Sequence, residues 1–214
     1  ASAEIYRLEI PGGQYSNLRP QVESFGIDEC WLDVTGSKRL FGDGVTIANT
    51  LRENMKNELG LTISVGVSFN KIFAKLGSDM KKPDATSIIP YESFKNIVWK
   101  MRVEEMMGIG RATKNKLNKH GIYTLGQLAQ SSPEFCRKIL GKPGEDIWCN
   151  ANGYGSDIVA RYNNYAPVKS VGRGNTFDHD LTSNEEVRAM LFFLSEDVAL
   201  RLRNGSLLAT KIQI

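Results

Sequence analysis

The order of apolar and polar positions predicts alternating strands and helices in the first part of the chain. Strands are expected where Val, Ile and aromatic residues cluster, within residues 23–36, at 62–68 and at 86–90. A helix is expected between the first two strands, because four apolar side chains fall four residues apart and the pattern stops at Gly60. These side chains are Ile47, Leu51, Met55 and Leu59. A second helix is expected over residues 70–79.

Beyond residue 90 the pattern changes to helical segments that glycines interrupt. The stretch at 163–167 is typical of a linker, and residues 168–177 are expected to be extended. A capping-box signature at 183–186 predicts a helix that runs to about Arg203. The last residues, 207–214, predict a strand.

These patterns predict an α/β (α+β) chain with three parts. Residues 1–90 would form a partial sheet with helices, residues 91–165 an all-helical part, and residues 166–214 an incomplete β-α-β unit. Within the first part, residues 1–20 contain the breaker Pro11-Gly12-Gly13 and look like a tail or a cut edge. At 214 residues the chain is long enough to bury a proper core.

Composition narrows the class of protein only slightly. A hydrophobic content of 41% and a charged content of 24% are ordinary for a soluble globular protein, and a net charge of +3 is too small to prove a nucleic-acid partner. Cys30, Cys136 and Cys149 lack CxxC spacing, which argues against structural zinc and for free thiols in a reducing cytoplasm. No apolar run reaches membrane-spanning length, and no signal-peptide pattern is present. We therefore expect a soluble intracellular protein without a membrane partner.

Two adjacent carboxylates, Asp28 and Glu29, stand inside the apolar run at residues 23–36. Removing ionised carboxylates from water is costly, and two together repel each other, unless a cation compensates them. A hard divalent ion with oxygen ligands, Mg²⁺ or Mn²⁺, would do so. Neighbours on a flat strand face opposite ways, so a shared ion needs a twist or turn, which Gly26 would permit. Alternatively, one acid faces solvent and the other pairs with Lys or Arg.

A glycine turn at residues 107–122 predicts an anion site. Gly108, Ile109 and Gly110 open a short helix, and Gly121-Ile122 with a following Thr closes the pattern of a helix-hairpin-helix motif. Bare glycine backbones let N–H groups approach a phosphate at a helix N-terminus. The surrounding cations are Arg111, Lys114, Lys116 and Lys119. The motif indicates contact with the DNA backbone, and the alternative is an ordinary helix–helix turn with a solvated basic face.

A lysine cluster follows the second predicted strand. Lys71, Lys75 and Lys82 are spaced so that they would share a helix face, but Pro83 forces Lys82 out of helical geometry and into a loop. A loop lysine near metal-binding carboxylates suits a triphosphate, and Lys71 and Lys75 are candidates for contact with DNA. The alternative is a solvated lysine stripe on a helix.

The three motifs occur in an order and spacing that resemble the Y-family translesion DNA polymerases, particularly the bacterial DNA polymerase IV type. The family signature Ser-Ile-Asp-Glu-Ala-Phe/Tyr-Leu-Asp corresponds to Gly-Ile-Asp-Glu-Cys-Trp-Leu-Asp at residues 26–33. The Asn-Lys-x-x-Ala-Lys…Lys-Pro and Gly-Ile-Gly…Gly-Ile-x-Thr motifs follow. The similarity runs from about Val22 to the end of the chain, whereas residues 1–20 match poorly.

The resemblance implies a role for each candidate residue. Asp28 and Glu29 would hold the two catalytic Mg²⁺ ions of the palm, which Mn²⁺ can replace, and Lys82 would bind the triphosphate. Residues 91–165 would be the thumb, whose Gly108–Gly110 turn grips the primer strand. Lys169 and Arg173 would lie in the linker and first strand of the little finger and contact DNA. The implied partners are primer-template DNA, deoxynucleoside triphosphates and, for a full-length protein, a sliding clamp, in a bacterial cytoplasm.

The departures from the family pattern predict a piece of a polymerase, truncated at both ends. Nothing upstream of Asp28 looks like the family's opening strand with its first metal-binding Asp, the little finger stops halfway, and the sliding-clamp motif is absent. We therefore expect the chain to bind primer-template DNA weakly and not to extend it. One alternative is a non-catalytic, polymerase-like DNA-binding accessory protein. Another is a nucleotidyl cyclase, which the helix-hairpin-helix motif disfavours.

Overall fold

A computed structural model provides the structure of the chain. It describes residues 21–25, 28–155, 158–160 and 167–214. The chain forms two compact units, residues 1–164 and 165–214, and each is described by itself. The tail expected at residues 1–20, the turn expected at Gly26 and most of the expected linker lie outside the described residues.

The chain around the predicted carboxylate strand forms a β-hairpin. Strand β1 (Gln21–Ser24) pairs antiparallel with β2 (Cys30–Asp33), and Val22 lies opposite Leu32. The backbone N–H of Phe25 donates to the carbonyl of Glu29 at 2.6 Å, which closes the turn. The run that the sequence suggested as one buried strand therefore contains two short strands, β1 and β2, that pair with each other.

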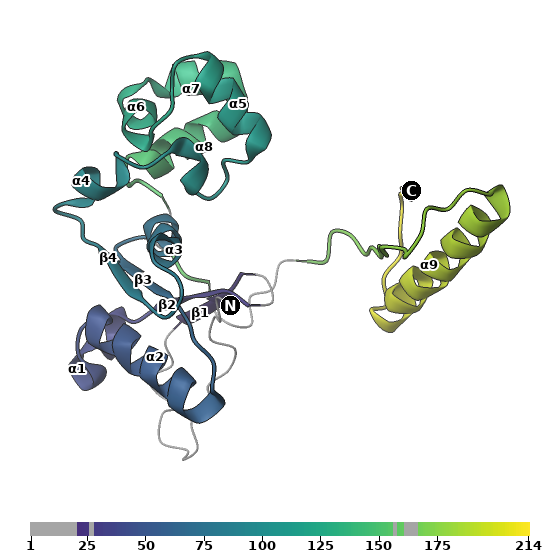
Figure 1. The fold of residues 1–214 in the computed structure, drawn as a ribbon, viewed down its shortest axis with the longest axis horizontal. Helices are drawn as coiled ribbons and strands as arrows, with labels where there is room; N and C mark the ends of the chain where they lie inside the picture. The colour runs from purple at the N-terminus through teal and green to yellow at the C-terminus, as the bar shows by residue number, and fades with distance from the viewer. Residues whose placement is uncertain (1–20, 26–27, 156–157, 161–166) are drawn as a thin grey trace. The chain divides into compact units, whose positions relative to one another are not determined.

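The next elements form a β-α-β unit, as the alternating pattern predicted. Strand β3 (Val65–Ser68) lies parallel to β4 (Thr86–Ile89), and α3 (Lys71–Met80) connects them (Figure 1). A glycine allows α3 to approach the sheet closely. A Cβ atom on Gly66 would lie 1.8 Å from the carbonyl oxygen of Ala74 and 2.5 Å from the backbone nitrogen of Ser78.

Helix α2 (Gly44–Leu59) also packs on this β-α-β unit. Asp43 caps its start by accepting a hydrogen bond from the Thr46 N–H, and Gly60 ends it in left-handed geometry with φ of 66°, as predicted. Met55 is buried with Ile63 in a small core. The helix ends at Leu59, which is 60% exposed in the last turn. Short helices η1 (Thr35–Ser37) and α1 (Lys38–Phe41) precede α2.

The partial sheet that the sequence predicted is divided into two sheets. Within the described residues, β1 and β2 form one sheet and β3 and β4 form another. A cavity of about 350 Å³ is lined by residues of both sheets and of α2 and α3, including Glu29, Lys71 and Lys75. Two-stranded sheets need packing partners to be stable, and here the helices supply much of that packing.

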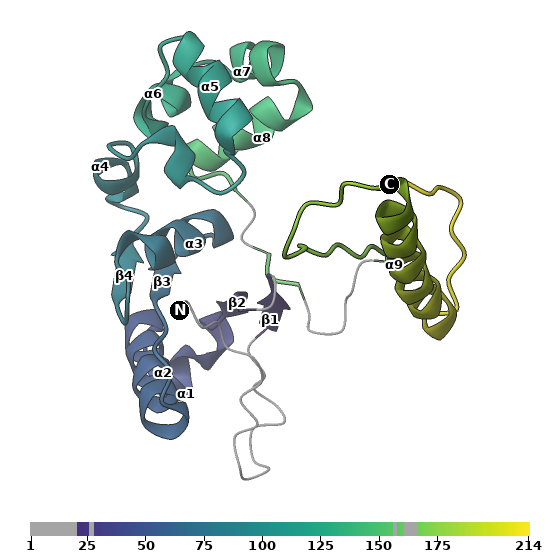
Figure 2. The same ribbon diagram turned by 45° about the vertical axis from the view of Figure 1, so that its right-hand side comes forward.

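The helical part of the first unit consists of short helices with a shared core (Figures 1 and 2). They are α4 (Phe94–Val98), η2 (Val103–Glu105), α5 (Arg111–Lys119), α6 (Leu125–Gln130), α7 (Pro133–Leu140) and α8 (Lys142–Ala151). Leu117, Leu125 and Leu128 are fully buried in this core. It continues to Phe73 of α3 and Ile89 of β4, so the β-α-β unit and the helical part pack on each other. The boundary expected near residue 90 stays a prediction.

The second unit contains one long helix, α9 (Asn184–Asn204). Its capping box is confirmed: the Ser183 hydroxyl accepts from the Glu186 N–H, and Glu186 accepts from the N–H of Ser183. Among residues 167–214 no strand forms, although the sequence predicted strands on both sides of the helix. An extended segment becomes a strand only when it pairs with a neighbour, and these two segments do not pair.

Candidate active site and nucleic-acid interface

The two predicted metal-binding acids lie at the turn of the hairpin, immediately before β2. Asp28 is exposed and Glu29 is half-buried, so the expectation of two acids inside a buried strand was wrong. A turn keeps the charged groups near water, which is less costly than placing them between apolar neighbours. The turn also removes the constraint that neighbours on a flat strand face opposite ways.

Glu29 is joined to the predicted triphosphate lysine by a chain of alternating charges. The Nζ of Lys75 lies 2.7 Å from Oε1 of Glu29 and 3.0 Å from Oδ2 of Asp79. The Nζ of Lys82 lies 2.8 Å from Oδ1 of the same Asp79. The fold therefore brings the turn of the hairpin, α3 and the loop after α3 together. Lys82 lies in that loop, as Pro83 predicted, because α3 ends at Met80.

A second ion pair connects α3 to the hairpin. The Nζ of Lys71 lies 2.6 Å from both carboxylate oxygens of Glu23 and 4.6 Å from the centre of the Trp31 ring. The Trp31 indole N–H donates to the carbonyl of Lys71 at 3.0 Å, and the backbone N–H of Ala160 donates to Glu23 at 2.8 Å. Both Lys71 and Lys75 thus have carboxylate partners, and their predicted contact with DNA stays a prediction.

The charged groups of this cluster shift one another's pKa values. Burial lowers the pKa of Lys75, but hydrogen bonds and charge from Glu29 and Asp79 outweigh it, so its pKa is raised. Burial raises the pKa of Asp79, but Lys82 and Lys75 reverse the effect and lower it. For Glu23, burial is likewise outweighed by the Ala160 N–H and Lys71, and its pKa is lowered.

The donor chemistry of Asp28 and Glu29 fits a hard divalent cation, because both offer carboxylate oxygens. Their arrangement fits less completely. Among the described residues, no group of three His, Cys, Asp or Glu side chains is placed to hold a metal ion. In the structure Lys75 compensates the charge of Glu29. This arrangement matches the alternative prediction from the sequence: Asp28 faces solvent, and Glu29 pairs with a lysine.

The glycine turn opens α5, and α6 follows Gly121 and Ile122, in the predicted order; the assignment of a helix-hairpin-helix motif stays a prediction. Gly108 has φ of 91°, a backbone conformation that residues other than glycine rarely adopt. Gly110 is the N-cap of α5, and no side chain caps this end of the helix. Ile109 is buried beneath the turn. The first N–H groups of a helix lack intrahelical acceptors, so this turn presents backbone donors that suit a phosphate oxygen. Gly121, with φ of 77°, ends the motif.

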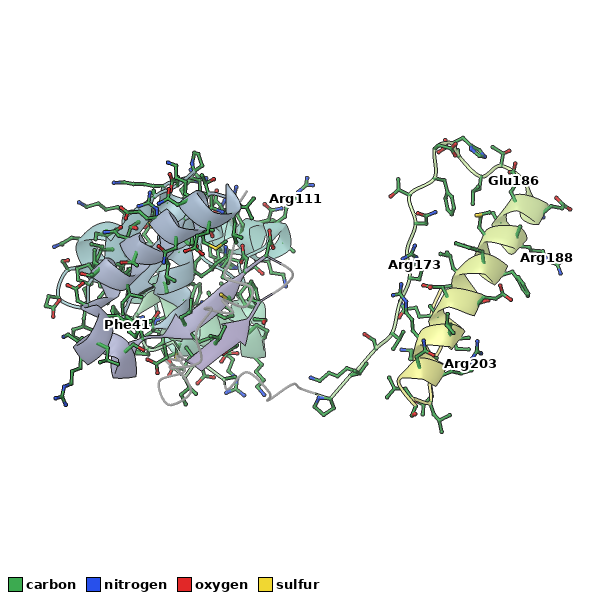
Figure 3. The ribbon with its side chains drawn as sticks, turned by 90° about the horizontal axis from the view of Figure 1, so that it is seen from below. Phe41, Arg111, Arg173, Glu186, Arg188 and Arg203 are labelled. Carbon is green, nitrogen blue, oxygen red and sulfur yellow. The ribbon has the colours of Figure 1, made fainter. Side chains whose placement is uncertain are left out.

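Glu104 compensates Lys114, one of the four cations of this motif. Arg111 is exposed and points outward from its unit (Figure 3). Lys114 instead lies 2.8 Å from Oε1 of Glu104, which also contacts Arg102 at 2.7 Å. Hydrogen bonds from Lys114 and Arg102 lower the pKa of Glu104 to about 2. Lys116 and Lys119 are exposed on α5.

In the second unit, the two predicted DNA contacts have different surroundings. Lys169 is exposed in the extended segment. Arg173 lies beside α9, where its Nε is 3.7 Å from Oδ2 of Asp197, which also pairs with Arg201 at 2.9 Å (Figure 3). Arg201 donates to the carbonyl of Gly172 at 3.2 Å, so this segment is attached to the helix.

The sequence analysis did not identify the acidic partners of three candidate lysines. Glu23, Asp79 and Glu104 contact Lys71, Lys75 and Lys114 respectively. A helical spacing of four residues could have indicated Asp79 as a partner of Lys75. The other two pairs join separate elements, and nothing in the local sequence indicates them.

Comparisons with known proteins identify the family of the chain. The impB/mucB/samB family matches residues 12–79, and the C-terminal domain of that family matches residues 168–214. The match begins at residue 12, so the expectation that similarity starts near Val22 was wrong. Among the described residues, no helix is both long enough and apolar enough to cross a membrane.

Several relatives cover almost all of the chain. A DNA polymerase IV of Acetivibrio thermocellus is 50% identical over 200 residues, which are 94% of this chain and 50% of that protein. A DNA polymerase IV of Clostridium kluyveri is 36% identical over 94% of this chain and 50% of its own length. The chain thus spans about half the length of the curated relatives that it matches.

Solved structures share the fold. A Y-family DNA polymerase chimera superposes with a TM-score of 0.71 and 25% identity over 84% of this chain and 52% of its own. The DinB protein of Sulfolobus solfataricus gives a TM-score of 0.58 and 27% identity over 65% of this chain and 41% of its own. Together, the matches in sequence and in fold show that the chain belongs to the impB/mucB/samB family and is of the Y-family DNA polymerase IV type.

Proposed function

We propose that this chain supplies part of a DNA-directed DNA polymerase for translesion synthesis and DNA repair. The observation that carries the proposal is the charged chain from Glu29 through Lys75 and Asp79 to Lys82. It connects a candidate metal ligand to a candidate triphosphate ligand across three separate elements. A polymerase needs these two kinds of group close together, because the metal ions and the triphosphate meet at the reacting phosphorus.

In this proposal Asp28 and Glu29 offer carboxylate oxygens to Mg²⁺, for which Mn²⁺ can substitute. Bound Mg²⁺ would activate the primer 3′-OH and neutralise charge on the triphosphate and the departing pyrophosphate. Lys82 binds the triphosphate of the incoming deoxynucleotide through its ammonium group. Lys75 compensates Glu29 and Asp79, so that the repulsion between these acids does not distort the site.

The helical part would bind the backbone of primer-template DNA. The support is the N-terminus of α5, where Gly108 and Gly110 leave backbone N–H groups accessible beside the exposed Arg111. Lys169, exposed in the second unit, would add a backbone contact. Such contacts carry no sequence information, which suits an enzyme that copies any template. Binding to a sliding clamp and a bacterial cytoplasmic location stay predictions.

Template-directed extension tests the proposal against its rival, an accessory protein that binds DNA without chemistry. A full-length protein of the relatives' size that contains this chain is given a labelled primer-template, deoxynucleoside triphosphates and Mg²⁺. We expect primer extension that EDTA abolishes and that follows the template base. Binding to the primer-template without extension, in Mg²⁺ and in Mn²⁺, would favour the accessory protein. The prediction that the 214-residue chain alone does not extend a primer is checked in parallel.

A further inference from the structure

We propose that Arg52 of α2 is a positioning residue for triphosphate binding, acting through Asp84 on the loop that carries Lys82. This inference rests on the proposed role of Lys82. Arg52 itself lies on a different element from every candidate residue considered so far. Besides a long contact of 3.5 Å with Oδ1 of Asn49 on its own helix, its guanidinium contacts the segment that begins two residues after Lys82.

The contacts of Arg52 converge on Asp84 and the start of β4. Its Nε and Nη2 donate to Oδ1 of Asp84 at 3.1 and 2.7 Å, and Nη2 also donates to the backbone carbonyl of Asp84. Its Nη1 lies 3.4 Å from the hydroxyl of Thr86. One planar guanidinium therefore holds both the side chain and the backbone of Asp84, a geometry that a lysine could not reproduce.

The backbone at Asp84 has a conformation that requires such support. Asp84 has φ of 54°, in the left-handed region that residues other than glycine seldom occupy. The Asp84 and Arg52 side chains are 22% and 21% exposed, so water competes only partly for these hydrogen bonds. Next to Asp84, the carbonyl of Ala85 accepts a hydrogen bond from the Val65 N–H at 2.8 Å. The end of the loop is thus fixed to α2 and to β3.

These attachments restrict where Lys82 can lie. The loop begins where α3 ends at Met80 and ends at Asp84, so Lys82 stands in a short segment with both ends held. Its ammonium group contacts Asp79 at one side of this segment. Binding a triphosphate with a flexible side chain carries an entropy cost, and a fixed backbone lowers that cost. Loosening Asp84 should therefore weaken binding at Lys82 without removing any group that touches the nucleotide.

A matched control is available on the same carboxylate. The Nζ of Lys56 lies 3.0 Å from Oδ2 of Asp84, and its side chain is 60% exposed. Lys56 contributes the same charge from the same helix. Among the interactions of the described residues, it contacts the side chain of Asp84 and not its backbone. Comparing Arg52→Ala with Lys56→Ala therefore separates the loss of the backbone support from the loss of one positive charge.

The test is a titration of the isotopically labelled chain with dATP and Mg²⁺, followed by NMR at the backbone amides of Lys81, Lys82, Asp84 and Ala85. We expect dATP to shift these amides and Lys82→Met to weaken binding strongly. Arg52→Ala should weaken binding about three- to tenfold and Lys56→Ala less than about twofold. Arg52→Lys keeps the positive charge but loses the planar guanidinium, so its dATP affinity should resemble that of Arg52→Ala. Thermal unfolding of each variant checks that it is folded.

A double-mutant cycle gives a readout that a purely structural role would not move. If Arg52 acts through Lys82, Arg52→Ala should change dATP affinity little when Lys82 is already Met. An equal loss in both backgrounds, or no loss with Lys82 present, would overturn the inference and leave the role of Lys82 intact. If dATP does not shift the amides of Lys81, Lys82, Asp84 and Ala85 in the unmodified chain, the proposed triphosphate site is itself wrong, and the inference falls with it.

Discussion

The Nζ of Lys75 lies 2.7 Å from Oε1 of Glu29, so a lysine of α3 compensates the acid at the turn of the hairpin. The two side chains are only 15% and 20% exposed. Lys75 also contacts Asp79, which in turn contacts Lys82. This lysine therefore lies between the candidate metal ligand and the candidate triphosphate ligand, and it connects the stability of the fold to the chemistry of the site.

Replacing Lys75 with Met should destabilise the first unit by about 1–2 kcal/mol, because Glu29 and Asp79 lose their shared cation in a half-buried place. The difference in unfolding free energy between the unmodified chain and Lys75→Met should become smaller at high pH. The folded pKa of Lys75 is raised above 10.5, so its stabilisation is complete below pH 10.5 and lost as pH rises through the folded value. Urea unfolding at pH 7 and above pH 10.5 measures this difference.

The control is Lys100→Met, which removes an exposed lysine of the same unit. Its effect on unfolding should be within about 0.5 kcal/mol at both pH values. Equal stabilities for Lys75→Met and Lys100→Met would show that the contact with Glu29 does not stabilise the fold.

Replacing Arg111 with Ala should weaken binding to duplex DNA and reduce its salt dependence. Arg111 is exposed beside the Gly110 N-cap, where a phosphate contact would release counterions. Losing one such contact should reduce the slope of log K against log salt by about 1. Fluorescence anisotropy at several salt concentrations measures the slope, with Arg39→Ala, an exposed arginine of α1, as the control. If both variants lose the same slope, the glycine turn has no special role.

Replacing Glu104 with Gln should remove one source of acid sensitivity from the helical part. Its pKa is lowered from 4.5 to about 2 by Lys114 and Arg102, so its stabilisation is present above pH 4.5. That stabilisation is lost as pH falls from 4.5 towards 2. Unfolding measured across this range should fall less steeply for Glu104→Gln than for the unmodified chain.

Glu58→Gln, at an exposed position of α2, is the comparison for this experiment, and it should keep the steep fall. Identical profiles for Glu104→Gln and the unmodified chain would contradict the assignment of the ion pairs around Glu104.

Replacing Gly66 with Ala should destabilise the β-α-β unit by roughly 3 kcal/mol or more, because the new Cβ would overlap the backbone of α3. The helix would have to move away from β3, and Lys75 would move with it. Gly36→Ala is the control, since no atom lies within 4 Å of a Cβ at that position. Chemical unfolding of both variants gives the comparison, and similar midpoints would contradict the close packing.

Local signals in the sequence were sufficient for several elements. The left-handed Gly60 ended α2, the capping box at Ser183 opened α9, and Pro83 placed Lys82 in a loop, as expected. Each of these features depends on interactions within a few residues, so local sequence determines them. The glycine turn at Gly108 and Gly110 belongs to the same class.

Features that depend on distant contacts were not predictable in this way. The turn at Asp28 and Glu29 follows from the pairing of β1 with β2, which apolar content alone does not indicate. The partner of Lys114 is Glu104, an acid of another element. The expected strands of the second unit did not form, because pairing depends on neighbours and not on composition.

The most direct test of the central claim is metal-dependent primer extension with Asp28→Asn and Glu29→Gln in a full-length protein that contains this chain. The matched control is Asp33→Asn, which alters a carboxylate of β2 whose oxygen accepts a hydrogen bond from the Thr35 N–H. The account predicts a loss of at least about a hundredfold in kcat for the first two variants, with DNA binding retained, and little change for the third. Equal activity in all three variants would contradict the assignment of Asp28 and Glu29 as metal ligands.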